Sequence, residues 1–141
     1  MEILVTNEFQ KTQLSKKHFP DAGLDIRSAV DIIVPAGGRV LVSTELFISI
    51  PVGMVGEIKS RSGLAVKHGI TAFNGIIDGG YLGEVKVLLF NHSDKYFAVN
   101  KGDRIAQLLT SFVALENYTP VTEFSTETAR SDNGFGSSGV K

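Results

Sequence analysis

The stretch Phe73–Phe90 reads Phe-Asn-Gly-Ile-Ile-Asp-Gly-Gly-Tyr-Leu-Gly-Glu-Val-Lys-Val-Leu-Leu-Phe, and this pattern predicts a β-hairpin. An apolar run ends on Asp78, a Gly-Gly pair turns the chain, and a second, alternating run begins at Glu84. The tip therefore carries a carboxylate and, three residues later, the ring of Tyr81. A simple turn, with an aspartate beside a half-buried tyrosine, would explain this pair without any function. A binding site at the tip is the alternative.

Short β-rich runs, separated by turn residues, continue on both sides of this hairpin. They are spaced by roughly 8 to 12 residues, which is typical of an antiparallel sandwich, jelly roll or barrel. A helical pattern of one or two turns is present only around residues 63–68. The sequence therefore predicts an all-β domain, with strands at Ile3–Val5, Leu24–Ser28, Asp31–Val34, Arg39–Thr44, Leu46–Ile50, Met54–Lys59, Gly69–Phe73, the two arms of the hairpin and Arg104–Val113.

The composition changes near residue 125. A chain of 141 residues suits one domain with one core. Residues 125–141 are rich in Gly and Ser and contain little to bury besides Phe135, which predicts a mobile segment in the free protein. We therefore expect a β-barrel domain over residues 1–124 and a flexible C-terminal arm over residues 125–141.

The composition also excludes several classes of function. The chain has no cysteine, so it has no disulfide, no thiolate metal site and no Cys nucleophile. Its 3 histidines lie in different segments, which argues against a transition-metal site held by protein ligands. A formal net charge of −1 gives no field that would attract a nucleic-acid polymer. Without a signal peptide or membrane span, we expect a soluble, intracellular protein, cytoplasmic or, in a eukaryotic or viral setting, nuclear.

The segment Arg61-Ser62-Gly63 has the composition of a phosphate cradle. The arginine supplies a planar fork of donors, the serine a hydroxyl, and the glycine lets main-chain N–H groups approach an oxyanion. A turn with a surface arginine is the alternative. The tail after Arg130 is no P-loop, because it lacks the Gly-Lys-Ser/Thr ending. Its single ring, Phe135, suits stacking on a planar base, and a disordered tail is the alternative.

Two further segments carry polar groups within predicted strands. Alternation in the strand after residue 102 places Asp103, Ile105 and Gln107 on one face. Asp103 could pair with Arg61, and Gln107 could donate to a ligand; an ordinary half-buried strand is the alternative. Asp25 lies early in a strand, where a turn carboxylate is the alternative.

These segments occur in one order and with one set of spacings, and together they resemble the five motifs of the trimeric dUTP diphosphatases (dUTPases). The resemblance runs from about residue 20 to residue 139. The matching segments are Ala22-Gly23-Leu24-Asp25, Arg61-Ser62-Gly63-Leu64-Ala65, Gly75-Ile76-Ile77-Asp78 with Tyr81 and Gly83-Glu84, Gly102-Asp103-Arg104-Ile105-Ala106-Gln107-Leu108, and Arg130 with Gly134-Phe135-Gly136-Ser137-Ser138-Gly139.

The resemblance implies a jelly-roll-like β-barrel that forms a homotrimer with exchanged C-terminal arms. Three active sites would lie at subunit interfaces, and each would take motifs from more than one chain. The implied reaction is hydrolysis of dUTP to dUMP and pyrophosphate, which limits uracil incorporation into DNA and supplies dUMP for dTMP synthesis. The implied cofactor is Mg²⁺, held mainly by the substrate triphosphate and by water.

The resemblance also implies residue roles. Asp78 would contact the deoxyribose 3′-hydroxyl and orient the attacking water, and Tyr81 would lie under the sugar and exclude a 2′-hydroxyl. The main chain of Phe73–Ile77 would read uracil, Phe135 would cover the base, and Asp25 would reach the metal only through water. The substrate-binding residues implied in this way are Arg61, Ser62, Gly63, Asn74, Gly75, Ile77, Tyr81, Gln107, Arg130, Phe135, Gly136 and Ser137.

Four positions depart from many members of that family. Gly80 stands where many relatives have a second acid. Without that acid, this chain lacks one water-mediated contact to the metal, which would affect its Mg²⁺ dependence. Ser60 stands in place of a proline, Leu24 in place of an aromatic residue and Ser131 in place of a glycine. These three concern packing or arm flexibility, so no group that the hydrolysis needs is missing.

Two other functions stay open from the sequence. One is a binding or regulatory module that keeps the nucleotide pocket and acts through a protein partner. The other is a deoxycytidine-nucleotide deaminase of related fold. The intact Asp78, Tyr81, Arg130 and Phe135 favour a working hydrolase, as does the match of the hairpin and the C-terminal arm to the hydrolase pattern.

Overall fold

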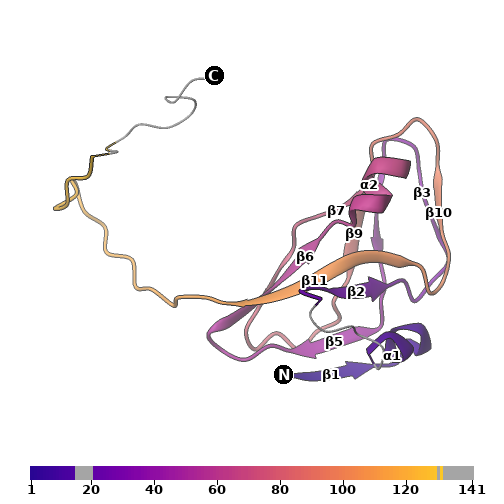
Figure 1. The fold of residues 1–141 in the computed structure, drawn as a ribbon, viewed down its shortest axis with the longest axis horizontal. Helices are drawn as coiled ribbons and strands as arrows, with labels where there is room; N and C mark the ends of the chain where they lie inside the picture. The colour runs from indigo at the N-terminus through magenta and orange to yellow at the C-terminus, as the bar shows by residue number, and fades with distance from the viewer. Residues whose placement is uncertain (15–20, 130, 132–141) are drawn as a thin grey trace.

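Short antiparallel strands form most of the domain, as predicted. The computed structural model describes residues 1–14, 21–129 and 131. In the described residues the chain forms β1 (Glu2–Val5), α1 (Glu8–Leu14), β2 (Leu24–Arg27), β3 (Ile32–Val34), β4 (Arg39–Val42), β5 (Leu46–Ser49), β6 (Met54–Lys59), α2 (Ser62–His68), β7 (Ile70–Ala72), β8 (Ile76–Asp78), β9 (Val87–Asn91), β10 (Phe97–Val99) and β11 (Arg104–Phe112). The strands wrap into a jelly-roll-like barrel with the two helices at its periphery (Figure 1).

Within the described residues, the strands pair into four antiparallel sheets. The largest has the order β2-β11-β6-β8, and the next has the order β4-β9-β7. Two-stranded pairs, β1 with β5 and β3 with β10, complete the barrel. The long β11 pairs with β2 along one edge and with β6 along the other, so it joins segments that are far apart in the sequence.

The core of the barrel is aliphatic. Side chains alternate between core and surface along β5 and β9, as expected for strands with one buried face. Each fully buried side chain contributes about 1.5–3 kcal/mol of hydrophobic stabilisation. The largest of them that are apolar are Ile26, Leu46, Ile50, Ile70, Leu89 and Ile105.

The alternation expected at the start of β11 is interrupted. The register between β11 and β2 shifts between Arg104 and Ala106, which makes Ile105 the extra residue of a β-bulge. Ile105 and Ala106 are therefore both buried. The predicted grouping of Asp103, Ile105 and Gln107 on one face is wrong, because Ile105 enters the core while the two polar residues stay at least partly exposed.

The predicted hairpin is paired only at its base. There β7 pairs with β9, and the Phe73 N–H donates a hydrogen bond of 2.8 Å to the Leu88 carbonyl. Nearer the tip the arms separate, because β8 pairs with β6 while β9 pairs with β4 and β7. The hairpin prediction is thus confirmed for the base and wrong for the tip, where the two arms join different sheets.

The sequence pattern does not predict α1 or β10. α1 begins after Asn7, whose Oδ1 accepts a hydrogen bond from the Phe9 N–H at 3.1 Å. The fully buried Gln10 donates to the Asp25 carbonyl at 2.8 Å and accepts from the Arg27 N–H at 2.7 Å. The side chain of Gln10 therefore binds β2 as a neighbouring strand would, and α1 holds the strand that carries Asp25.

The helical prediction around residues 63–68 is confirmed by α2. The helix ends at Gly69, which has a left-handed backbone with φ of 66°. The Gly69 N–H donates to the Ala65 carbonyl at 3.0 Å and so satisfies one of the last carbonyls of the helix.

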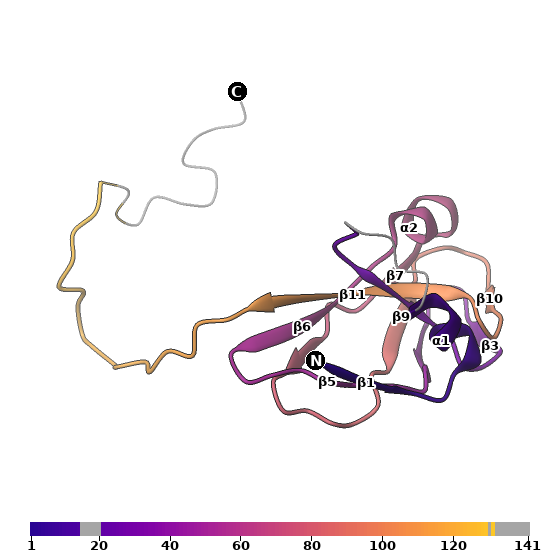
Figure 2. The same ribbon diagram turned by 60° about the horizontal axis from the view of Figure 1, so that its bottom comes forward.

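After β11, the described residues up to Ala129 form neither helix nor strand. They lead away from the barrel (Figures 1 and 2). Leu115, Tyr118 and Phe124 are 70%, 91% and 90% exposed in this segment. Several large apolar side chains exposed within one short segment are typical of a surface that another molecule covers. Among the described residues, no helix is both long enough and apolar enough to cross a membrane.

Candidate functional site

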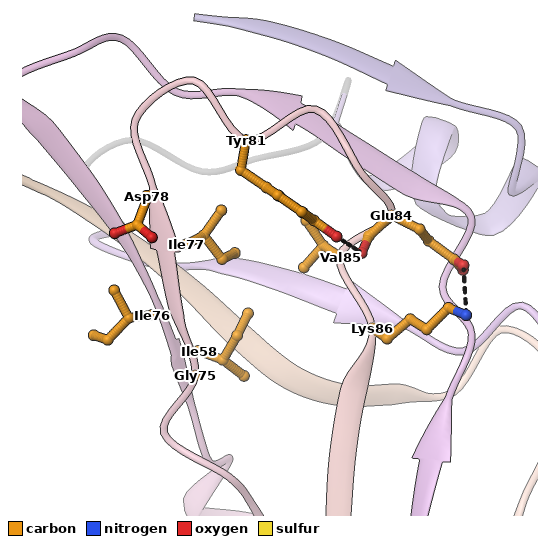
Figure 3. A pocket seen from close by; sticks show the side chains of 9 residues that line it. All are labelled: Ile58, Gly75, Ile76, Ile77, Asp78, Tyr81, Glu84, Val85 and Lys86. Carbon is orange, nitrogen blue, oxygen red and sulfur yellow. Dashed lines mark hydrogen bonds and ion pairs between the residues drawn. The ribbon is translucent and has the colours of Figure 1, made fainter.

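A pocket of about 620 Å³ lies between the separated arms of the hairpin. Figure 3 shows β8 on one side and residues 84–86 on the other, with Tyr81 reaching across between them. The space is left because the two arms pair with different sheets and not with each other. The residues that line the pocket are Ile58, Gly75, Ile76, Ile77, Asp78, Tyr81, Glu84, Val85 and Lys86.

The first wall of the pocket is β8. Its pairing with β6 sets Asp78 opposite Val55, and the Gly75 carbonyl accepts a hydrogen bond of 2.9 Å from the Ile58 N–H. β8 uses one edge for this pairing and turns the other toward the second arm (Figure 3). The wall is therefore a rigid part of the largest sheet, and Asp78 is exposed at its end.

The turn at the tip requires both of its glycines. The Tyr81 N–H donates to the Asp78 carbonyl at 3.1 Å, and Gly80 has φ of 88°, as the third position of a type II turn demands. A Cβ on Gly79 would lie 2.8 Å from the Pro51 carbonyl oxygen, which is too close. These constraints set the angle between Asp78 and Tyr81.

Tyr81 is held against the main chain of the second arm. Its hydroxyl donates to the Glu84 carbonyl at 3.2 Å. A Cβ on Gly83 would collide with the tyrosine hydroxyl, so any larger residue there would push the ring out of this position. The ring is 47% exposed and offers a flat apolar surface beside the pocket.

Residues 84–86 form the second wall of the pocket. The carboxylate of Glu84 in this wall is held by several hydrogen bonds. Its Oε1 accepts hydrogen bonds from the Ser43 hydroxyl and from the N–H groups of Thr44 and Glu45, the last two at 3.0 Å. Its Oε2 lies 3.5 Å from Lys86 Nζ. Burial alone would raise the pKa of Glu84, but these hydrogen bonds and the lysine together hold its pKa below the ordinary value.

A second cluster of charged groups surrounds Asp25. Its carboxylate lies 3.2 Å from Arg61 Nε and 3.5 Å from Arg104 Nη1. Burial, followed by the positive charge of Arg104, lowers the pKa of the nearby Arg27. Three guanidinium groups gathered beside one carboxylate suit this cluster to a polyanion.

The expected pairing of Asp103 with Arg61 is wrong. Asp103 instead accepts a hydrogen bond of 2.8 Å from the Asn100 N–H, within the turn that precedes β11. Arg61 reaches Asp25 because β2, β11 and β6 lie side by side in the largest sheet.

Ser62 and Gly63 begin α2, directly after the arginine of this cluster. Both are exposed, and a Cβ on Gly63 would meet no atom within 4 Å. The fold therefore does not require glycine at this position. Gln107 lies opposite Asp25 in the pairing of β11 with β2, and a Cβ on Gly23 would lie 3.0 Å from its Oε1. Gly23 thus lies close to the end of the glutamine side chain.

Asp78 and the Asp25 cluster lie at different ends of the largest sheet. Gln107 pairs with Asp25 on one side and with Lys59 on the other, whereas Asp78 pairs with Val55. Three strand spacings and four residues of strand rise therefore separate the two carboxylates, a distance on the order of 15–20 Å. Within one chain, the predicted site residues therefore form two separate groups, one around Asp25 and one around Asp78.

The remaining predicted site residues divide into two groups. Arg130, Phe135, Gly136 and Ser137 lie outside the described residues. Asn74 is exposed and does not line the pocket, whereas Gly75, Ile77 and Tyr81 do. Among the described residues, no group of three or more His, Asp or Glu could hold a metal ion, and the Asp25 carboxylate is already engaged by two arginines.

Sequence reasoning gave no role to Glu84, Lys86 or Arg104. The alternation of Glu84 and Lys86 was consistent with an ordinary strand, and the groups that bind the Glu84 carboxylate come from about 40 residues earlier in the chain. Arg104 was part of a matching segment, but its contact with Asp25 depends on the pairing of β11 with β2. Local pattern carries no signal for either contact.

Comparison with known proteins agrees with this geometry. The dUTPase family model matches residues 10–139. The deoxyuridine 5′-triphosphate nucleotidohydrolase of Saccharomyces cerevisiae is 48% identical over 118 residues, which cover 84% of this chain and 80% of that protein. The corresponding protein of Paramecium bursaria Chlorella virus 1 is 45% identical over 119 residues, 84% of each chain.

The fold matches solved structures as well. The dUTPase of Staphylococcus bacteriophage 80alpha with dUPNHPP is 28% identical, with a TM-score of 0.90 over 99% of this chain and 98% of that chain. The family model and the curated relatives each cover most of the sequence, including the open hairpin and the Asp25 cluster. On this basis, the chain belongs to the dUTPase family.

Proposed function

We propose that this protein hydrolyses dUTP to dUMP and pyrophosphate. The observation that carries the proposal is the open hairpin, which places Asp78 and Tyr81 at the mouth of a pocket in a chain of the dUTPase family. In cells this reaction would limit uracil incorporation into DNA and supply dUMP for dTMP synthesis. The curated relatives support the substrate, because they are named for it.

The pocket suits a small planar base. One edge of β8 faces the second arm, so the main-chain donors and acceptors of β8 that do not pair with β6 would be available to the edge of uracil (Figure 3). Fixed main-chain groups discriminate well between bases, because a wrong base leaves buried polar groups unpaired. The buried side chains of Ile58 and Val85 narrow the pocket, which disfavours the extra methyl group of thymine.

Asp78 is the residue that we assign to catalysis. The α-phosphorus is shielded by negative oxygens, so a neutral water needs a carboxylate that orients it and draws its proton. Asp78 is exposed at the end of a rigid strand and is free to contact both the sugar and this water. Tyr81 would lie under the deoxyribose, where its ring leaves no room for a 2′-hydroxyl.

The Asp25 cluster would receive the phosphates. Arg61, Ser62, Gly63 and Gln107 offer a guanidinium, a hydroxyl, main-chain N–H groups and an amide around it. The open space at Gly63 supports close approach of an oxyanion to the main chain. Bound Mg²⁺, carried by the triphosphate, would neutralise charge on the pyrophosphate leaving group. Asp25 would reach the ion only through water, because its carboxylate binds two arginines.

The separation of the two clusters supports a shared site. A carboxylate and a phosphate cradle on the order of 15–20 Å apart in one chain cannot act on the same α-phosphate. In a homotrimer with sites at the interfaces, Asp78 of one chain would face the Asp25 cluster of another. The exposed apolar side chains of residues 113–124 support exchange of the arm, which would bring Arg130, Phe135, Gly136 and Ser137 to a neighbouring site.

One assay tests the proposed function. The protein is incubated with Mg²⁺ and each of dUTP, dTTP, dCTP, dATP, dGTP and UTP, and both pyrophosphate and ammonia are followed. Pyrophosphate from dUTP alone is the expected result. Ammonia from dCTP would instead indicate the deaminase, and no product from any nucleotide would contradict hydrolysis.

A second function is favoured by one relative. Phage 80alpha dUTPase is described as controlling the transfer of virulence genes by a G protein-like mechanism, and it matches 99% of this chain. A regulatory role for this protein would need a partner whose affinity changes with bound nucleotide. It would be seen as partner capture that differs between nucleotide-free protein and protein saturated with a non-hydrolysable dUTP analogue.

A further inference from the structure

The carboxylate of Glu84, on the second wall of the pocket, is held by an unusually large number of donors. Three donors converge on its Oε1: the Ser43 hydroxyl and the main-chain N–H groups of Thr44 and Glu45. Glu45 reaches this geometry with φ of 53°, a left-handed backbone that is uncommon for a residue with a side chain. The turn is therefore shaped to present successive N–H groups to one carboxylate.

The same turn also binds the main chain that follows Glu84. The Thr44 hydroxyl donates to the Val85 carbonyl, and the Val85 N–H donates to the Leu46 carbonyl at 2.8 Å. Phe47 forms an isolated bridge with Glu84. Side-chain and main-chain contacts together fasten the second wall to residues 43–47, on the side away from the first wall.

Tyr81 depends on this wall for its position. Its hydroxyl donates to the Glu84 carbonyl at 3.2 Å, and its ring passes over Gly83 without room for a Cβ. The main chain of Glu84 thus holds the Tyr81 hydroxyl, and the side chain of Glu84 holds that main chain in place. Figure 3 shows the Tyr81 hydroxyl meeting the main-chain carbonyl of Glu84, while the Glu84 side chain extends toward Lys86.

We infer that Glu84 is a positioning residue for sugar specificity. Its carboxylate, held by Ser43, Thr44 and Glu45, fixes the second wall and through it the ring of Tyr81. The inference rests on the proposed function, in which that ring lies under the deoxyribose. Glu84 itself touches no reacting atom. Its loss lets the ring move away from the sugar, and the pocket then admits a 2′-hydroxyl more readily.

The matched control is Glu57. This glutamate also forms an ion pair with a lysine two residues later, with Glu57 Oε1 3.2 Å from Lys59 Nζ. It lies in β6 and does not line the pocket. Glu57→Gln therefore removes a comparable strand carboxylate without disturbing the turn at residues 43–47.

The experiment measures kcat and KM for dUTP and for UTP in wild type, Glu84→Ala, Glu84→Gln, Ser43→Ala and Glu57→Gln. We expect Glu84→Ala to lower the ratio of kcat/KM for dUTP over UTP by about tenfold or more, because misplacement of a wall by about 1 Å has effects of that size. Glu84→Gln keeps an oxygen that accepts from both N–H groups, so its ratio should stay within about threefold of wild type. Glu57→Gln should match wild type.

A second readout follows the contact itself. Amide proton shifts of Thr44 and Glu45 should move upfield in Glu84→Ala and stay close to wild type in Glu84→Gln. If Glu84→Ala does not fold, Ser43→Ala carries the test with a smaller loss of the same ratio.

Distinct outcomes separate the inference from the function on which it rests. Equal losses of kcat/KM for dUTP and UTP, in Glu84→Ala and Ser43→Ala alike, would indicate a structural role and overturn the inference. So would a folded Glu84→Ala whose ratio is unchanged. If wild type released no pyrophosphate from dUTP, the proposed function itself would fail and this inference with it.

Discussion

Asp78 and Asp25 lie in the two outer strands of one four-stranded sheet, Asp78 at the end of β8 and Asp25 in β2. The sheet holds them on the order of 15–20 Å apart. If Asp78 is the catalytic carboxylate and the Asp25 cluster the phosphate cradle, as we propose, they would have to come from different copies of the chain to act on one nucleotide.

A complementation experiment tests this shared site. Asp78→Asn and Arg61→Ala should each be nearly inactive alone, because each lacks one half of every site. After unfolding and refolding together in equal amounts, about a quarter of the sites would combine an intact Asp78 with an intact Arg61 and recover activity. Refolding each variant alone is the control, and no recovery in the mixture would contradict a site built from two chains.

Two glycines should respond in opposite ways to substitution by alanine. Gly79→Ala brings a Cβ to 2.8 Å from the Pro51 carbonyl oxygen, so it should lower the free energy of unfolding by roughly 1–3 kcal/mol. Gly63→Ala meets open space, so stability should be unchanged or rise by up to about 1 kcal/mol. Its KM for dUTP should nevertheless increase, because the new methyl group stands where a phosphate would approach. Urea unfolding and steady-state kinetics give both answers, and a Gly63→Ala protein with normal KM would remove Gly63 from the site.

Removal of the arm should separate folding from turnover. A chain that ends after Thr128 keeps every strand of the barrel, so it should fold with a thermal midpoint near that of the full chain. Closure of the arm would exclude bulk water and add Arg130 and Phe135 to the site, so hydrolysis should fall by a factor on the order of 10² or more. Circular dichroism and pyrophosphate release measure the two effects. Full activity in the shortened chain would contradict a role for the arm.

The Glu84 carboxylate should make stability depend on acidity. Its pKa is held below the ordinary value of 4.5, so the folded state binds its proton less readily than the unfolded state does. The stabilisation is therefore complete above pH 4.5 and is lost as the pH falls through the folded-state pKa. The groups that face the carboxylate are Ser43, Thr44, Glu45 and Lys86.

Urea unfolding of wild type and Glu84→Gln between pH 7 and pH 3 checks this. The difference in free energy of unfolding should be largest at neutral pH and should shrink below pH 4.5. A difference that stayed constant over the whole range would show that the charge of Glu84 contributes nothing.

Much of the fold could be predicted because it depends on local pattern. Alternating apolar residues between Gly, Pro and Asn turns located most strands to within one or two residues, and the short helical pattern around residues 63–68 located α2. α1 escaped prediction because its stability comes from contacts with β2, made by Asn7 and Gln10 across about 15 to 20 residues of chain. The bulge at Ile105 escaped because strict alternation was assumed.

The candidate site likewise has a part that local sequence predicted and a part that depends on tertiary contacts. Asp78, Tyr81 and the glycines between them were visible as a turn with two candidate site residues, and the structure places both at the pocket. The opening of the hairpin was not visible, since nothing in its two arms says that β8 pairs with β6 instead. The bonds of Glu84 to Ser43 and of Arg104 to Asp25 depend on tertiary pairing, which local sequence does not encode.

The most direct test of the central claim compares pyrophosphate release from dUTP by wild type and by Asp78→Asn, with Mg²⁺ present and folding checked by circular dichroism. Asparagine keeps the shape of the side chain but cannot accept a proton from the attacking water. We predict that wild type releases pyrophosphate from dUTP and that Asp78→Asn is slower by a factor on the order of 10²–10⁴. A folded Asp78→Asn protein with near-normal turnover would contradict the account.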